Sequence, residues 1–222
     1  MNPHHYLNQN QVSQLIKLLG TSHISPKSIE AIEEEIKEEP DCVAVELDPG
    51  RYEALKSGKK GDYPSLFFRI LSWLQKKLGE KTGVMPGEEM LTAVETARKN
   101  GIRVYLMDRP IGKTISKFKK VGIIEKLKLF IHSTGVPENY NFDLKDVPPE
   151  KLVKDAVEVI SESAPNIYSI LIDERDEIMS MALEDLSKDY ENVLAVVGAG
   201  HLPGLEKRFK ARGVEFEDKT FK

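Results

Sequence analysis

The feature that most constrains the fold is the alternation of short apolar runs with longer segments of helical period. The run VLAVV at 193–197 contains no polar residue, and a strand dispenses with polar side chains when both faces of its sheet are covered. Similar runs predict strands at 14–19, 42–48, 103–108, 193–197 and 214–217. The pattern therefore predicts an α/β fold, with a central mixed or mostly parallel sheet covered by helices.

Apolar residues at a 3.6-residue period, in several cases after an opening Pro or Ser, predict the helices. The predicted helices are 26–38, 63–78, 87–100, 123–132, 149–163, 165–188 and 205–212. Because residues 110–190 are almost entirely helical in this pattern, we expect a helical subdomain inserted before the last two strands. Residues 13–222 are expected to form one α/β domain, preceded by a flexible polar leader at 1–12.

Two Gly- and Lys-rich stretches, at 56–61 and 79–87, are expected to be mobile loops. They bracket the apolar helix predicted at 63–78. Its residues suit core packing or a homodimer surface, and a lid or a membrane-interface element are further interpretations.

Composition narrows the classes of partner and setting. The 32 basic residues are interleaved with 36 acidic ones for a net charge of -4, so nucleic acid is not an expected partner. The single Cys42 cannot form an intrachain disulfide, and the N-terminal residues lack the pattern of a secretory signal. No apolar run approaches the ~20 residues of a membrane span. We therefore expect a cytoplasmic or cytoplasm-facing protein.

Two GxxH turns, GTSH at 20–23 and GAGH at 198–201, each follow a predicted strand. A Gly at the end of a strand permits a sharp turn with an unusual φ, and the edge beyond it is where open α/β folds bind ligands. A lone GxxH occurs by chance, but two in matching contexts are a stronger indication. If the two strands are neighbours, the imidazoles of His23 and His201 share one cleft.

The strand predicted at 42–48 ends in two carboxylates, Glu46 and Asp48. Because side chains alternate along a strand, both are expected on the same side, within reach of an imidazole-bound metal or of a water for general-base attack. Asp48 has a simpler interpretation, because a residue of this type before Pro49 is typical of a helix N-cap.

Two further charged pairs contain candidate site residues. Arg175 and Asp176 fall within the apolar stripe of the helix predicted at 165–188. A buried charged pair is costly unless it is paired or used, so it is either a structural ion pair or a contact to substrate and transition state. Asp108 and Arg109 end the strand predicted at 103–108, on the same rim as the two GxxH turns.

With these residues assembled, the sequence resembles the TraB/PrgY family, which is grouped with the TIKI and GumN proteins and more distantly with ChaN and erythromycin-esterase-like proteins. The matching segments are GTSH with the following SPKSIEAI, VAVELD with the following RYEAL, GEEM, LMDR, ERD and VVGAGH, over about residues 18–204. Pro110 departs from the acidic residue that usually follows the Asp-Arg pair in the family.

The resemblance implies a metal-dependent peptidase that relies on two GxxH motifs, a glutamate and an arginine. These correspond to His23, His201, Glu46 and Arg175. The implied cofactor is a divalent ion, with manganese or cobalt favoured and zinc also compatible with imidazole and carboxylate ligands. Binding roles are assigned to Arg51, Glu89, Asp108, Arg109 and Asp176.

The resemblance also bears on partners. Some relatives limit peptide pheromone signalling, which fits cleavage or sequestration of a peptide, and full-length members often continue into membrane helices. A peptide or protein substrate is therefore the expected partner.

Three functions stay open at this point. In the first, His23, His201 and Glu46 hold the ion, and Arg175 stabilises the oxyanion of the tetrahedral intermediate; Glu46 is alternatively the general base. In the second, an imidazole acts as the base of a metal-independent hydrolase. In the third, the chain is a non-catalytic peptide- or ligand-binding module in signalling. No nucleotide-binding or GxSxG motif occurs.

Overall fold

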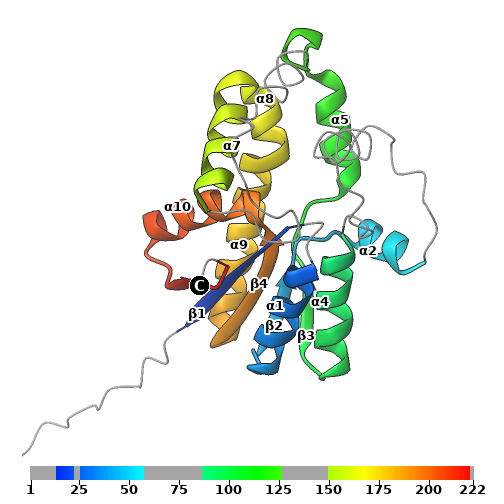
Figure 1. The fold of residues 1–222 in the computed structure, drawn as a ribbon, viewed down its shortest axis with the longest axis vertical. Coiled ribbons are helices and arrows are strands. Elements are labelled where there is room, and N and C mark those ends of the chain that lie inside the picture. Colours follow the sequence, from blue (N-terminus) through cyan, green and yellow to red (C-terminus); the bar gives the residue numbers. More distant parts are fainter. Residues whose placement is uncertain (1–13, 23–25, 58–86, 127–149, 221–222) are drawn as a thin grey trace, which may run out of the picture.

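The five strands form one parallel sheet at the centre of the molecule (Figure 1). The structure, a computed structural model, describes residues 14–22, 26–57, 87–126 and 150–220. Its strands are β1 (Leu15–Thr21), β2 (Cys42–Val45), β3 (Arg103–Leu106), β4 (Asn192–Gly198) and β5 (Phe216–Asp218). Their order is β3-β2-β4-β1-β5, and every described pairing is parallel. The predicted α/β class is confirmed.

Helices connect these strands in the described ranges. They are α1 (Pro26–Lys37), α2 (Pro49–Lys56), α4 (Glu88–Lys99), α5 (Ile111–Lys120), α7 (Glu150–Ser163), α8 (Pro165–Tyr168), α9 (Glu174–Asp189) and α10 (Leu202–Arg212). A π-helical segment, η2 (Ser169–Asp173), joins α8 to α9, and a 3-10 turn, η3 (Ala199–His201), joins β4 to α10.

The position of β4 in the sheet explains why the run at 193–197 lacks polar residues. Val193, Ala195 and Val197 pack with α9 and α10 on one face of the sheet, whereas Leu194 and Val196 pack with α1 and α4 on the other. All five are fully buried. The molecule therefore has three layers, with the sheet between two pairs of helices.

The described residues between β3 and β4 form helices joined by short connections, which confirms the predicted helical insertion before the last two strands. Helix α9 packs back onto the sheet through Met179 and Leu183. Helices α5, α7 and α8 instead extend beyond one end of the sheet, at the top of Figure 1. A small core that includes Phe118 and Ile167 joins α5 to α8.

Two strands end earlier than predicted. β2 stops at Val45 and β3 at Leu106, not at 48 and 108. The amide of Leu47 donates to the carbonyl of Val45 at 2.7 Å, and this tight turn leads into α2. Glu46 and Asp108 consequently lie on loops at the sheet edge, free of the strict alternation of a strand.

The helix predicted at 165–188 contains a feature that its periodicity did not indicate. Segment η2 interrupts it with a π-helical turn. Arginines bind carbonyl oxygens around this turn: Arg109 donates to Ile170 and Arg175 to Leu171. Such turns recur at functional sites, and this one ends two residues before Arg175.

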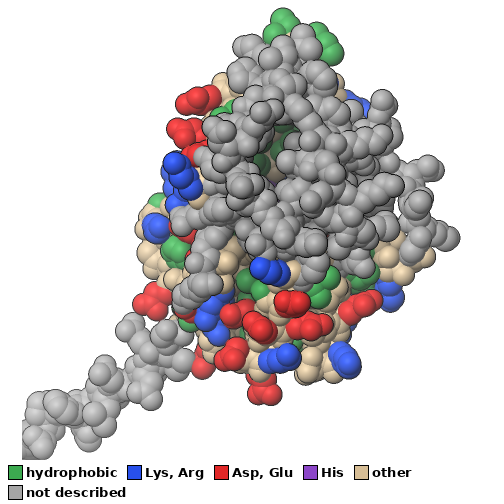
Figure 2. Space-filling view, viewed as in Figure 1, with side chains coloured by type: hydrophobic (Ala, Val, Ile, Leu, Met, Phe, Trp, Pro, Cys, Tyr) green, Lys and Arg blue, Asp and Glu red, His purple; other side chains and the backbone are tan. Residues whose placement is uncertain are grey.

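Several predictions lie outside the described residues, namely the leader at 1–12, the helix at 63–78, most of the two loops around it and most of the helix at 123–132. α5 was not predicted as a separate helix. None of the helices in the described ranges combines the length and apolar character that crossing a bilayer requires. Figure 2 shows acidic and basic side chains intermixed over the face that carries α1 and α4.

Candidate functional site

The two GxxH turns follow neighbouring parallel strands. Gly20 of β1 pairs with Val197 of β4, and Thr21 pairs with Gly198. Both GxxH turns therefore lie at the same edge of the sheet. His201 is described and buried at this edge. His23 lies outside the described residues.

The expected role of the glycines is wrong. Gly198 has φ -62° and ψ 137°, and Gly20 is not among the described residues with positive φ. Gly20 is needed because the chain packs closely there: a Cβ would lie 2.5 Å from Cδ1 of Leu202 and 2.9 Å from Oγ1 of Thr220. Gly198 contributes its amide, which donates to Oε2 of Glu46 at 2.7 Å.

Glu46 is the acceptor at the centre of the site and is only 3% exposed. Its Oε2 accepts from the Gly198 amide, and its Oε1 accepts from Nη2 of Arg175. Oε1 also lies 3.3 Å from Nε2 of His201. The end of β2, helix α9 and the turn after β4 therefore meet at this one carboxylate.

The imidazole of His201 is held from its other side by Asp176. Nδ1 of the ring lies 2.5 Å from Oδ1 of Asp176, whose side chain is fully buried. Asp176 comes from α9, next in sequence to Arg175. A carboxylate on one ring nitrogen fixes the orientation of the ring and leaves the other nitrogen directed at a ligand or a substrate.

Four of the five N–H donors of Arg175 bind oxygen atoms within the protein. Nε and Nη2 bind the two oxygens of Asp108, and Nη2 also binds Glu46. Nη1 binds the carbonyl of Leu171 at 3.0 Å and faces Nε2 of His201 at 3.1 Å. Arg175 and Asp176 do not pair with each other, because Arg175 contacts Asp108 and Glu46 while Asp176 contacts His201.

Asp108 extends the network to two more arginines. Nη1 of Arg51 lies 3.2 Å from its Oδ2 and also donates to the carbonyl of Glu46 at 3.3 Å. The amide of Arg109 donates to Oδ1 at 2.8 Å. The guanidinium of Arg109 points away from the network, toward Thr114 and Glu174.

These contacts shift the pKa values of the buried groups. Burial acts to lower the pKa of Arg175, but the carboxylates of Glu46 and Asp108 outweigh it and raise the pKa above its ordinary value. Burial also acts to lower the pKa of His201, and Glu46 and Asp176 outweigh it, raising the pKa to about 9. Burial raises the pKa of Asp176. Asp176 and His201 therefore hold a proton between them at neutral pH.

Two predicted site residues have other described contacts. Oδ1 of Asp48 accepts from the amides of Gly50 and Arg51 at 2.9 and 3.3 Å, so Asp48 is the N-cap of α2, as its simpler interpretation had it. Glu89 is buried in the first turn of α4, where Oε2 accepts from the amide of Gly87 at 3.1 Å.

The described donors supply part of a metal site. Nε2 of His201 and Oε1 of Glu46, 3.3 Å apart, form a nitrogen and oxygen pair that suits manganese, cobalt or zinc. No group of three or more His, Cys, Asp or Glu side chains that could hold an ion occurs among the described residues. The remaining predicted ligand, His23, is not among them. Because Arg175 faces the same Nε2, an ion held there requires its guanidinium to move.

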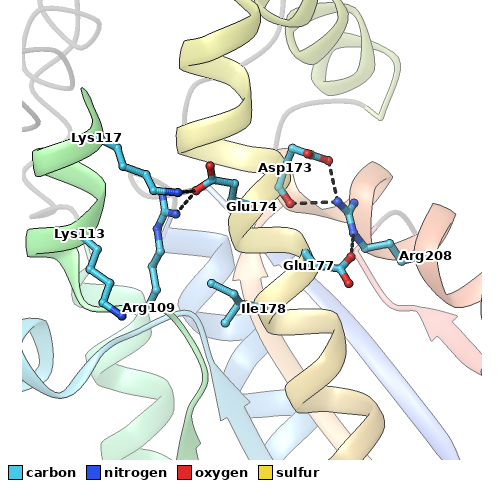
Figure 3. A pocket seen from close by; sticks show the side chains of 8 residues that line it. All are labelled: Arg109, Lys113, Lys117, Asp173, Glu174, Glu177, Ile178 and Arg208. Atoms are coloured by element: carbon cyan, nitrogen blue, oxygen red, sulfur yellow. Dashed lines mark hydrogen bonds and ion pairs between the residues drawn. The ribbon is translucent and has the colours of Figure 1, made fainter. Parts of the chain in front are cut away.

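A pocket of about 600 Å³ lies beside this network, between α5 and α9 (Figure 3). Arg109 and Lys117 point toward Glu174 from one side, and Arg208 binds Asp173 and Glu177 on the other. The pocket is joined to the network through neighbouring residues, since Arg109 follows Asp108 and Glu174 precedes Arg175.

Main-chain groups that hold the site residues in place could not be identified from the sequence. The Gly198 amide that binds Glu46 and the carbonyls of η2 that bind arginines give no side-chain signal. The one sequence signal for the role of the Gly198 amide was the Gly of the GxxH motif itself.

Comparison with known proteins gives a consistent result. A sequence model of the TraB/PrgY/gumN family matches residues 7–218. An uncharacterized protein of Methanocaldococcus jannaschii is 37% identical over 212 residues, covering 88% of this chain and 53% of that protein. TraB domain-containing proteins of Bos taurus and Mus musculus are 24% and 25% identical, each alignment covering 87% of this chain and 62% of the relative. The chain thus spans between about half and three fifths of the length of these relatives.

Proposed function

The chain belongs to the TraB/PrgY/gumN family, and we propose that it is a metal-dependent hydrolase that cleaves peptide bonds. One observation carries the proposal: Glu46, Arg175 and His201 come from three separate segments and contact one another at the ligand-binding edge of a parallel sheet. Three such side chains are costly to bury together without a use.

His201 and Glu46, together with His23, would hold the divalent ion. When bound, such an ion supplies a water of lowered pKa and polarises a carbonyl group. The mixed nitrogen and oxygen donors, at 3.3 Å, support this assignment.

Asp176 positions His201. Its contact with Nδ1 at 2.5 Å fixes which ring nitrogen faces Glu46, as carboxylates do behind the histidines of metal sites. The Gly198 amide positions Glu46 in the same way, since it binds Oε2 and leaves Oε1 directed toward His201.

Arg175 is first a positioning residue, because four of its N–H groups are bound to oxygen atoms of Asp108, Glu46 and Leu171. The Nη1 group that faces His201 can donate a hydrogen bond to a substrate oxygen without loss of the two-point contact between Arg175 and Asp108. A guanidinium at that point stabilises the negative charge that develops on a peptide carbonyl.

The neighbouring pocket is the proposed binding region for the peptide or protein substrate. Its volume of about 600 Å³ suits a short stretch of chain, and it opens next to Arg109. Its walls carry both signs of charge, so we propose that it accepts polar rather than purely apolar side chains.

A second candidate uses the same site without an ion. The contact between Asp176 and His201 is that of a carboxylate-histidine dyad, in which Nε2 takes a proton from water once the pH exceeds the raised pKa of His201 and this nitrogen is deprotonated. For both candidates we propose a location in the cytoplasm or on a surface that faces it.

Calorimetry with manganese, cobalt and zinc, on the wild type and on His23→Ala and His201→Ala, tests the first candidate. We expect one ion to bind the wild type and neither variant. Asp185→Asn, in a side chain that is 75% exposed, is the control for a nonspecific loss of charge. No ion binding by the wild type would overturn the metal-dependent mechanism.

Product analysis by mass spectrometry, with a mixture of peptides, separates the remaining functions. Cleavage that is lost on chelation and in Glu46→Gln supports the first candidate. Cleavage that survives chelation supports the metal-independent hydrolase. A peptide that binds and stays intact with the ion present supports a non-catalytic binding module.

A further inference from the structure

Two isoleucines stand out at the end of the molecule farthest from the sheet. Ile123 and Ile124 are 78% and 70% exposed, the highest values among the large hydrophobic side chains that the structure describes. They follow α5 at the top of Figure 1, where Figure 2 shows hydrophobic side chains at the surface. Adjacent, strongly exposed isoleucines indicate an interaction surface when the chain around them is fixed.

The chain around them is fixed by hydrogen bonds. Nζ of Lys126 donates to the carbonyl of Lys119 at 3.3 Å, so the helical residues 123–126 are held against the end of α5; residues 119–126 together are called the 119–126 turn. Glu125 binds the side-chain amide of Asn166 at 2.8 Å and the main-chain amide of Ile167 at 2.9 Å. The 119–126 turn is therefore attached to the start of α8, and its isoleucines are held outward.

The charged side chains around the turn are predominantly basic. Helix α5 carries four lysines and no acidic residue. Lys119 and Lys120 are exposed and form no ion pair with any residue that the structure describes. The single acidic side chain between 111 and 126 is Glu125, which is engaged with α8. The turn is thus locally positive in a chain of net charge -4.

We propose that the 119–126 turn docks on an anionic membrane surface. Ile123 and Ile124 enter the interface between headgroups and acyl chains, and Lys119 and Lys120 contact the anionic headgroups. A protruding end suits this partner, because a lipid surface yields to a small apolar projection whereas a protein partner needs a matching groove. The proposal is independent of the hydrolase activity.

Co-sedimentation with phosphatidylcholine vesicles, with and without phosphatidylserine and in the absence of divalent ions, tests the proposal. We expect the wild type to bind only the vesicles that contain phosphatidylserine and to be released by salt. The double variant Ile123→Ser, Ile124→Ser should lose at least about tenfold in binding. Lys119→Gln with Lys120→Gln should lose a similar factor.

Met181→Ser is the matched control, because Met181 is 55% exposed on α9, away from the turn. It should bind vesicles as the wild type does. Circular dichroism of each variant separates a lost contact from a lost fold. Equal binding by the isoleucine variant, or no wild-type binding at low salt, would overturn the proposal. The proposal would also be overturned if the wild type were a dimer and the isoleucine variant a monomer, since a second copy of the chain would then cover the turn.

Discussion

Arg175 and Asp108 face each other in a two-point contact, in which Nε donates to Oδ1 at 3.0 Å and Nη2 donates to Oδ2 at 2.7 Å. The two side chains are 11% and 3% exposed. A guanidinium makes such a fork and an ammonium does not. The contact holds a residue of α9 against the loop after β3, so it joins the helical segment to the sheet edge.

Replacement of Arg175 by Lys should therefore destabilise the protein although it keeps the charge. We expect the free energy of unfolding to fall by about 3 kcal/mol, because Asp108 and Glu46 lose hydrogen bonds while they stay buried. Urea denaturation measures the change. Arg103→Lys is the control, since Arg103 is exposed and bonds Tyr190. A variant as stable as the wild type would show that the fork contributes little.

Gly204 is needed for the close approach of Asp176. A Cβ at 204 would lie 1.8 Å from Oδ2 of Asp176, whereas a Cβ at Gly112 meets nothing within 4 Å. Both glycines lie in helices, α10 and α5, where alanine is otherwise favoured by about 0.5–1 kcal/mol. We expect Gly112→Ala to raise the free energy of unfolding and Gly204→Ala to lower it by about 1–3 kcal/mol. Thermal and urea denaturation of both variants check this, and a neutral Gly204→Ala would contradict it.

The central strands β2 and β4 were predictable because burial on both faces imposes an apolar sequence that few other structures need. Their ends were not. The turn at Leu47 depends on a local hydrogen bond to Val45 and on the cap that Asp48 provides for α2. The π-helical turn was equally hidden, because the arginines that bind its carbonyls come from distant points of the chain, such as Arg109.

Glu46, Asp108 and His201 could be expected at one edge because each follows or ends a predicted strand. Arg175 was singled out differently, by its place in an apolar helix stripe and by the family resemblance. The individual partners could not be predicted, and Arg175 and its neighbour Asp176 turn to different partners. A pattern places residues on an edge or a face, whereas hydrogen-bond partners depend on packing between elements far apart in the sequence.

Glu174 gives a prediction about acid stability. It binds Lys117 at 2.6 Å and also binds Arg109, and these contacts lower its pKa from the ordinary value of 4.5. The unfolded chain then binds more protons than the folded one in acid, so the stabilisation is present above pH 4.5 and is lost as the pH falls. The stability difference between wild type and Glu174→Gln should shrink on acidification from neutral pH. A difference that stays constant in urea denaturation at each pH would contradict this.

Cys42 gives the opposite dependence, at alkaline pH. Its side chain is fully buried at the start of β2, and burial, with a smaller effect of Asp41, raises its pKa to about 12. The native thiol should therefore resist alkylation by iodoacetamide at pH values where an exposed thiol reacts within minutes, since the thiolate is the reactive form. Rapid native alkylation, measured by mass spectrometry, would contradict this.

The same shift predicts how stability changes with pH. Above the ordinary pKa of 9.0 the unfolded chain releases the thiol proton, while the folded chain keeps it until about pH 12. The folded state then binds more protons, so the free energy of unfolding falls as the pH rises through this window. Cys42→Ala lacks the titrating group, which makes it the matched comparison. The stability of the wild type relative to Cys42→Ala should decrease between pH 8 and pH 11 in urea denaturation, and a constant difference would mean that the folded thiol ionises as readily as the unfolded one.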